Sequence, residues 1–134
     1  KNILILAEGL TAKHFINRIN KKRIGSNQYT VVTPKKMKDI KDAVSDMEFY
    51  KFDPTSYSKL REMIYSKNFT SVYIVLDSVQ ESTETLKNIR HIDKKIKVFL
   101  LDAWDAFGDI NSIYTKVFNI NQLLANRLFD HLPN

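Results

Sequence analysis

Short apolar runs alternate along this chain with stretches in which apolar residues recur every three or four positions. The first run, NILIL at residues 2–6, has no alternation of polar residues, as in a strand that is covered on both faces. Comparable runs predict further strands at residues 29–33, 49–52, 71–76, 96–101 and 112–118.

The intervening stretches have helical periodicity. Residues 11–20 place Phe15, Ile16 and Ile19 on one side of a helix, and Gly25 offers a stop after it. Strands that alternate with helices at this spacing form βαβ units. The pattern therefore predicts a Rossmann-like α/β domain, a doubly wound parallel sheet of about six strands with helices on both faces. The further helices are expected at residues 36–45, 56–66, 80–91 and 121–131.

Length and composition limit this interpretation. A chain of 134 residues is long enough for one domain with its own core, so we treat residues 1–134 as a single domain. Its first residue is Lys rather than Met, which predicts that the domain is excised from a longer chain. The absence of Cys from the sequence excludes disulfides and thiolate metal sites, and it agrees with a reducing compartment.

The chain is basic, with a formal net charge of +6. Two interpretations of this charge stay open: a lysine-rich solvated surface, or a basic face for an anionic partner such as a nucleotide, nucleic acid or lipid headgroup. No apolar run approaches the roughly 20 residues that cross a membrane.

The loop after the first strand resembles a phosphate-binding turn with altered glycines. A dinucleotide fingerprint has G-x-G-x-x-G here, and this chain has Ala7, Gly9 and Ala12 at those places. Glu8 adds a negative charge where phosphates would lie, while Thr11 adds a hydroxyl donor. The loop is therefore either a modified phosphate cradle or a plain strand-to-helix turn.

The end of the second strand also departs from a dinucleotide site. An acid usually binds the ribose hydroxyls there, but the chain has Thr33 followed by Pro34 and Lys35. Lysines at this place suit a ribose 2′-phosphate or a bare phosphate, or they form a solvated face.

The sequence carries no recognisable catalytic motif. It has no Tyr-x-x-x-Lys pair, Walker A loop, G-x-S-x-G elbow or H-E-x-x-H. Its three histidines, His14, His91 and His131, are far apart, so no metal site is expected. We predict that the chain is not an enzyme. The alternatives are a fragment of an NAD(P)-dependent oxidoreductase and an anion- or nucleic-acid-binding module. The second would use four lysines, Lys35, Lys36, Lys38 and Lys41.

Taken in order, the strand ends resemble the N-terminal lobe of a regulator of potassium conductance domain (RCK, or TrkA-N). The resemblance covers essentially the whole chain. Its carriers are NILILAEGLTA, YTVVTP, FDPTSYSKL, SVYIVLDSVQESTETLKNIRHID with KIKVFLL, and the tail VFNINQLLANRLFDHLPN.

This resemblance implies a cytoplasmic regulatory domain at the inner face of the membrane. It implies a homo-oligomer, a dimer or ring, that gates a potassium channel or transporter through rearrangement, with a membrane subunit or segment as partner and no nucleic acid. The late helix, with Leu123 to Phe129, and the aromatic residues Trp104 and Phe107 are expected either at the contact between copies or in the core.

The resemblance also implies a site for NAD(H) or another adenine nucleotide. The departures at Ala7, Leu10, Thr33 and Phe52 leave open which nucleotide binds. By position, the residues expected to line this site are Ala7, Glu8, Gly9, Leu10, Thr11, Thr33, Lys35, Asp53, Pro54, Thr55, Leu76, Asp77 and Ser78.

Overall fold

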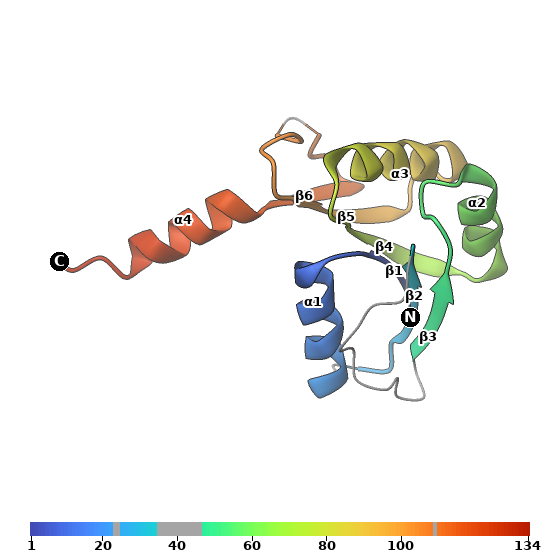
Figure 1. Ribbon diagram of the computed structural model, residues 1–134, viewed down its shortest axis with the longest axis horizontal. Helices are drawn as coiled ribbons and strands as arrows, with labels where there is room; N and C mark the ends of the chain where they lie inside the picture. The colour runs from blue at the N-terminus through green and yellow to red at the C-terminus, as the bar shows by residue number, and fades with distance from the viewer. Residues whose placement is uncertain (23–24, 35–46, 109) are drawn as a thin grey trace.

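Six parallel strands form one sheet in the order β3-β2-β1-β4-β5-β6 (Figure 1). The computed structural model describes residues 1–22, 25–34, 47–108 and 110–134. This strand order is that of a Rossmann fold. Strands β2 and β3 are added on one side of β1, and the chain then crosses over to add β4, β5 and β6 on the other side. The predicted fold class is therefore confirmed. The strands are β1 (Asn2–Ala7), β2 (Gln28–Thr33), β3 (Met47–Lys51), β4 (Phe69–Val75), β5 (Lys97–Asp102) and β6 (Thr115–Asn119).

Helices flank this sheet on both faces, as predicted. Helix α1 lies on one face, and α2 and α3 lie on the other, while α4 extends away from the sheet (Figure 1). The sixth strand begins at Thr115, three residues later than the predicted start at residue 112. The helix predicted at residues 36–45 lies outside the described residues. The helices are α1 (Leu10–Lys21), α2 (Tyr57–Ser66), α3 (Val79–Ile92) and α4 (Ile120–Asp130).

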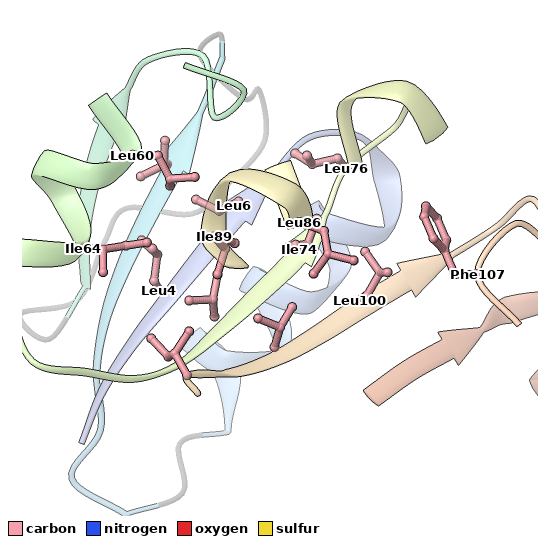
Figure 2. Close-up of a cluster of buried hydrophobic side chains, with 14 residues drawn as sticks. Leu4, Leu6, Leu60, Ile64, Ile74, Leu76, Leu86, Ile89, Leu100 and Phe107 are labelled. Atoms are coloured by element: carbon pink, nitrogen blue, oxygen red, sulfur yellow. The ribbon is translucent and has the colours of Figure 1, made fainter. Parts of the chain in front are cut away.

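The larger core lies between the sheet and the pair α2 and α3 (Figure 2). Strand residues such as Leu4, Leu6 and Leu100 meet Leu60 of α2 and Ile89 of α3, and all five are fully buried. Burying one such side chain contributes about 1.5–3 kcal/mol of transfer free energy. This core holds the strands of the sheet center and α3 in fixed positions relative to one another.

A smaller core lies on the opposite face, beneath α1. Ala12, Ile16 and Ile19 of α1 pack against Ile5 of β1 and Val31 of β2. The apolar positions of α1 recur at the helical spacing that the sequence predicted, so one side of this helix is buried and the other is exposed.

A row of four aromatic rings continues this face from α1 towards β6; we call it the aromatic row. Phe15 of α1 contacts Tyr73 of β4, which stacks on Phe99 of β5 with ring centroids 4.6 Å apart. Phe118 of β6 ends the row, 6.2 Å from Phe99. Burial raises the pKa of Tyr73, with a smaller contribution from Tyr29. Phe118 remains 36% exposed, so the row becomes more open towards β6.

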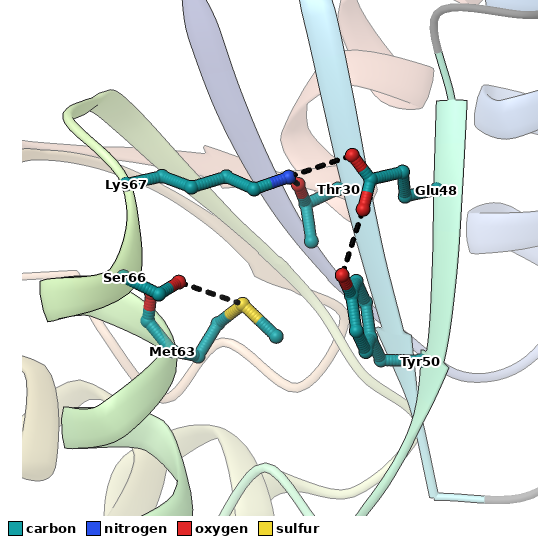
Figure 3. Close-up of polar contacts among 6 residues, drawn as sticks. All are labelled: Thr30, Glu48, Tyr50, Met63, Ser66 and Lys67. Atoms are coloured by element: carbon teal, nitrogen blue, oxygen red, sulfur yellow. Dashed lines mark hydrogen bonds and ion pairs between the residues drawn. The ribbon is translucent and has the colours of Figure 1, made fainter.

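At the other edge of the sheet, β3 exposes four of its five residues. Lys67 makes an ion pair with Glu48 at 2.8 Å, and the Tyr50 hydroxyl donates to the same carboxylate (Figure 3). The hydrogen bonds from Lys67 and Tyr50 lower the pKa of Glu48. Because solvent screens an exposed pair of this kind, it organises the edge more than it stabilises the fold.

Asp102, at the end of β5, fixes the loop that follows. Its side chain is fully buried and accepts backbone N–H groups from Trp104, Ala106 and Phe107 at 3.0–3.1 Å. Burial by itself raises the pKa of Asp102, but these N–H groups outweigh it and hold the pKa below the ordinary aspartate value. The loop turns back so that Phe107 is buried in the larger core.

Arg90 ties α3 to the last two strands. Its guanidinium donates to the carbonyls of Ile96 and Tyr114 at 2.7 Å and to the hydroxyl of Thr115 at 2.6 Å. Burial lowers the pKa of Arg90 against the opposing effect of Asp93, and an arginine guanidinium stays charged in proteins. Arg90 therefore links α3 to the start of β6, in addition to the pairing of β6 with β5.

Helix α4 follows β6 directly and has no buried residue. The sequence left open whether its apolar side chains are core or contact residues, and within this chain they are not core. Phe107 is core, and Trp104 packs partly against it. The exposed apolar residues of this segment are Leu123, Leu124, Leu128, Phe129 and Leu132.

Candidate functional site

The carboxyl ends of the strands meet at one edge of the sheet, where β1 and β4 are neighbours. Ala7 pairs with Val75, and the N–H of Glu8 donates to the Val75 carbonyl at 2.9 Å. In open parallel sheets ligands bind outside this edge, at the point where the strand order reverses. The loops after β1 and β4 are therefore the center of the candidate site.

The glycine loop makes a sharp turn into α1. Gly9 is the residue before the helix and has φ 94° and ψ −176°, a conformation that residues with a Cβ rarely adopt. Leu10 and Thr11 are exposed on the first turn, whereas Ala7 and Ala12 are buried and present no side chain to a ligand. The loop thus has a positive φ at the middle glycine of the fingerprint, directly before the helix.

The space over Gly9 is taken by Asp77, from the loop after β4. A Cβ on Gly9 would lie 2.8 Å from both Cγ and Oδ1 of Asp77. Such a distance is shorter than a van der Waals contact, so a side chain at position 9 would displace this carboxylate. The sequence predicted both residues for the site but not their contact, which depends on the pairing of β1 with β4.

The end of β2 contributes a buried residue. Thr33 is only 6% exposed, and its carbonyl accepts the N–H of Phe52 at 3.0 Å. Phe52 itself packs against the larger core. Lys35, which the sequence placed near the ribose, lies outside the described residues.

The turn after β3 is closed on itself and fastened to α3. The Asp53 carboxylate accepts both the N–H and the hydroxyl of Thr55, at 2.9 and 2.7 Å. The Asn88 amide of α3 donates to the Thr55 carbonyl at 2.9 Å, and Pro54 is buried. This turn is a rigid border of the site, with one Asp53 oxygen already engaged.

Three predicted residues follow β4, and two of them, Leu76 and Ser78, have structural roles. The Leu76 side chain is 1% exposed and belongs to the larger core. Ser78 caps α3, because its hydroxyl accepts the Glu81 N–H at 3.3 Å. Asp77, between them, is exposed and is the side chain of this loop that reaches Gly9.

These residues fit only part of a dinucleotide. Gly9 and the N-terminus of α1 supply close backbone approach and free N–H groups for a phosphate. The Asp77 carboxylate, however, lies directly over Gly9, on the side from which a phosphate would approach, and Thr33 offers no carboxylate to the ribose. In this geometry the site does not fit NAD(H) bound in the usual way.

The described residues include no group of three or more His, Asp or Glu side chains that could hold a metal ion. Among the described helices, none combines the length and the apolar character that crossing a bilayer requires.

Comparison with solved structures shows the fold. The chain is similar to the NAD(P)-binding domain of an exopolyphosphatase-related protein from Archaeoglobus fulgidus, with a TM-score of 0.70 and 12% identity. The match covers 96% of this chain and 94% of that one.

The chain is also similar to parts of larger proteins. A GalE-like L-threonine dehydrogenase from Cupriavidus necator matches 77% of this chain with a TM-score of 0.60 and 13% identity. The UDP-glucose 4-epimerase from Thermotoga maritima matches 84% with a TM-score of 0.59 and 12% identity. The chain spans only 37% and 41% of the lengths of these two proteins.

No family model matches the sequence, and no curated protein matches it. At identities of 12–13% the solved structures establish the architecture alone. The chain thus has the fold of NAD(P)-binding Rossmann domains, a nucleotide-binding fold, with an altered glycine loop at its switch point.

Proposed function

We propose that this chain is a cytoplasmic regulatory domain of a potassium channel or potassium transport system. It works by rearrangement of a homo-oligomer rather than by catalysis. The observation that carries the proposal is the resemblance of the strand ends to RCK domains, along essentially the whole chain. The match to an NAD(P)-binding domain supports the nucleotide-binding fold that such a regulatory domain requires.

The homo-oligomer is supported by two apolar surfaces that the chain leaves open. One is the β6 end of the aromatic row, where Phe118 is 36% exposed. The other is α4, on which Leu124 and Leu128 lie one turn apart and are 59% and 64% exposed. Because α4 begins at the residue after β6, it extends outward and does not fold back over the sheet (Figure 1).

A second copy of the chain is the occupant we propose for these surfaces. Each copy has one exposed helix and one open sheet face, so in a two-fold dimer the helix of each copy can cover the sheet face of the other. Large apolar side chains exposed together on one helix, as on α4, are typical of interaction sites. A ligand at the strand ends, or a membrane partner, would then need to favour one arrangement of the copies by only about 1–3 kcal/mol.

Sedimentation equilibrium tests the oligomer. We expect the unaltered chain to associate and Leu124→Asp to be monomeric at the same concentration, because a charge would be buried in the contact. Gln80→Glu adds the same charge on the exposed side of α3, away from both surfaces, and should leave the association unchanged. A monomer in all three cases would contradict the homo-oligomer.

Rubidium uptake tests the transport role. We expect cells that lack this chain to take up rubidium, a tracer for potassium, at an altered rate, and the unaltered chain to restore it. Complementation by Leu124→Asp should fail if association is required. Unchanged uptake without the chain would contradict a role in potassium transport.

A further inference from the structure

The contact between Gly9 and Asp77 bears on which ligands the strand-end site accepts. Helix α1 begins at Leu10, and Gly9 before it has no side chain to cap the first N–H groups. The first turn, Leu10 to Lys13, carries no acid. A helix start of this kind attracts an anion, since its free N–H groups and dipole present positive charge.

The anion nearest to Gly9 comes from another strand. Both carboxylate oxygens of Asp77 lie within 3.2 Å of the position that a Cβ on Gly9 would occupy. A pyrophosphate uses the same close approach to the middle glycine in dinucleotide-binding loops. The Asp77 side chain therefore holds both the space and the charge that such a phosphate would bring.

We propose that Asp77 is an internal anion that selects against phosphate at the glycine loop. The site then takes uncharged nucleosides in preference to nucleoside diphosphates and dinucleotides. This inference rests on the strand-end site being the ligand site of the proposed regulatory domain. Like charges a few ångströms apart repel, and the carboxylate must move before a phosphate can reach Gly9.

The polarity of the neighbouring positions agrees with this selectivity. Thr33 replaces the acid that would hold a ribose, and Glu8 adds a second carboxylate beside Gly9 in the sequence. No basic residue stands in the described loops after β1 and β4, at residues 8–9 and 76–78. A pyrophosphate would meet the Asp77 carboxylate at this point, and the basic residue closest to Gly9 in the sequence, Lys13, belongs to the first turn of α1.

Titration calorimetry with adenosine, ADP and NAD⁺ tests the proposal on the unaltered chain, Asp77→Asn and Asp77→Gly. We expect adenosine to bind all three alike. ADP and NAD⁺ should bind both variants about tenfold or more tightly than the unaltered chain, a moderate gain because exposed charges are partly screened. Glu84→Gln, which removes one negative charge from the exposed surface of α3, should bind like the unaltered chain.

Three results would overturn the proposal. If NAD⁺ binds as tightly to the unaltered chain as to Asp77→Asn, the Asp77 carboxylate does not select against phosphate. If affinity for NAD⁺ rises in Asp77→Gly alone, the size of the side chain and not its charge excludes the phosphate. Neither result argues against a ligand site at the strand ends. Binding of no probe to any form, with thermal melting showing each form folded, would also remove that site from the proposed function.

Discussion

The inner strands β1 and β2 and the outer strands β5 and β6 are all parallel, yet they are covered differently. In β1 the last four residues are buried without alternation, because α1 covers one face and α2 with α3 the other. In β5 buried residues alternate with partly exposed ones, and in β6 only Thr115 is buried. The burial pattern of a strand therefore depends on whether helices cover one of its faces or both. Strands β5 and β6 have the pattern of a sheet that is covered on one face.

The largest difference should appear when one apolar side chain is removed from each region. Leu6→Ala in β1 should cost about 2–5 kcal/mol of unfolding free energy, since Leu6 is fully buried and a cavity would remain. Phe118→Ala in β6 should cost less than about 1 kcal/mol in the monomer. Urea unfolding at low protein concentration measures both. Equal losses would show that β6 is as well covered as β1.

Arg90 should be the next most sensitive position, because it holds β6 to α3. Arg90→Ala removes donors from the carbonyls of Ile96 and Tyr114 and should cost about 3 kcal/mol. Arg90→Lys should recover only part of this loss, since lysine lacks the planar fork. Hydrogen exchange should quicken in β6 and not in β1. Uniform quickening would contradict a local role.

Asp102 should make the stability of the outer region depend on pH. Its pKa is lower in the folded than in the unfolded chain, so the carboxylate stabilises the fold above the unfolded pKa. That contribution is lost as the pH falls through the folded pKa. Asp102→Asn should therefore be about 1–3 kcal/mol less stable at neutral pH and lose less stability on acidification. Urea unfolding between about pH 7 and pH 2 measures this, and parallel pH profiles would contradict it.

The smallest effect concerns the glycine loop of the inner region. Gly9→Ala should cost about 1–2 kcal/mol, from the positive φ and from the displaced Asp77 carboxylate. Gly25→Ala is the matched control, since Gly25 also has a positive φ but nothing within 4 Å of its Cβ position. Thermal unfolding should give the larger loss at Gly9. Equal losses would mean that Asp77 moves aside freely.

Most of the architecture could be predicted from the sequence, because strands and helices that are buried on one face or both carry characteristic patterns of apolar residues. The run at residues 2–6 and the helical spacing of Phe15, Ile16 and Ile19 predicted β1 and α1 closely. The sixth strand was less exact. The Ser112 hydroxyl accepts the N–H groups of Tyr114 and Thr115 in a turn, and the strand begins only where Thr115 pairs with Val98.

The site was predicted less completely than the fold. The strand ends identified the loops that meet at the edge, and Gly9 with Asp77 is the pair that comes into contact. Leu76 and Pro54 turned out to be buried, because a position next to a strand end does not reveal on which face its side chain lies. The contact of Asp77 with Gly9 requires the pairing of β1 with β4, and no local pattern encodes that pairing.

The direct passage from β6 into α4 has a mechanical consequence. With no loop between Asn119 and Ile120, the helix behaves as a lever arm whose pivot is the outermost strand. Eleven residues of helix are about 16 Å long, so a 10° rotation of β6 moves the far end by about 3 Å. A small displacement at the edge of the sheet is thus amplified at the tip, where Leu128 and Phe129 are exposed.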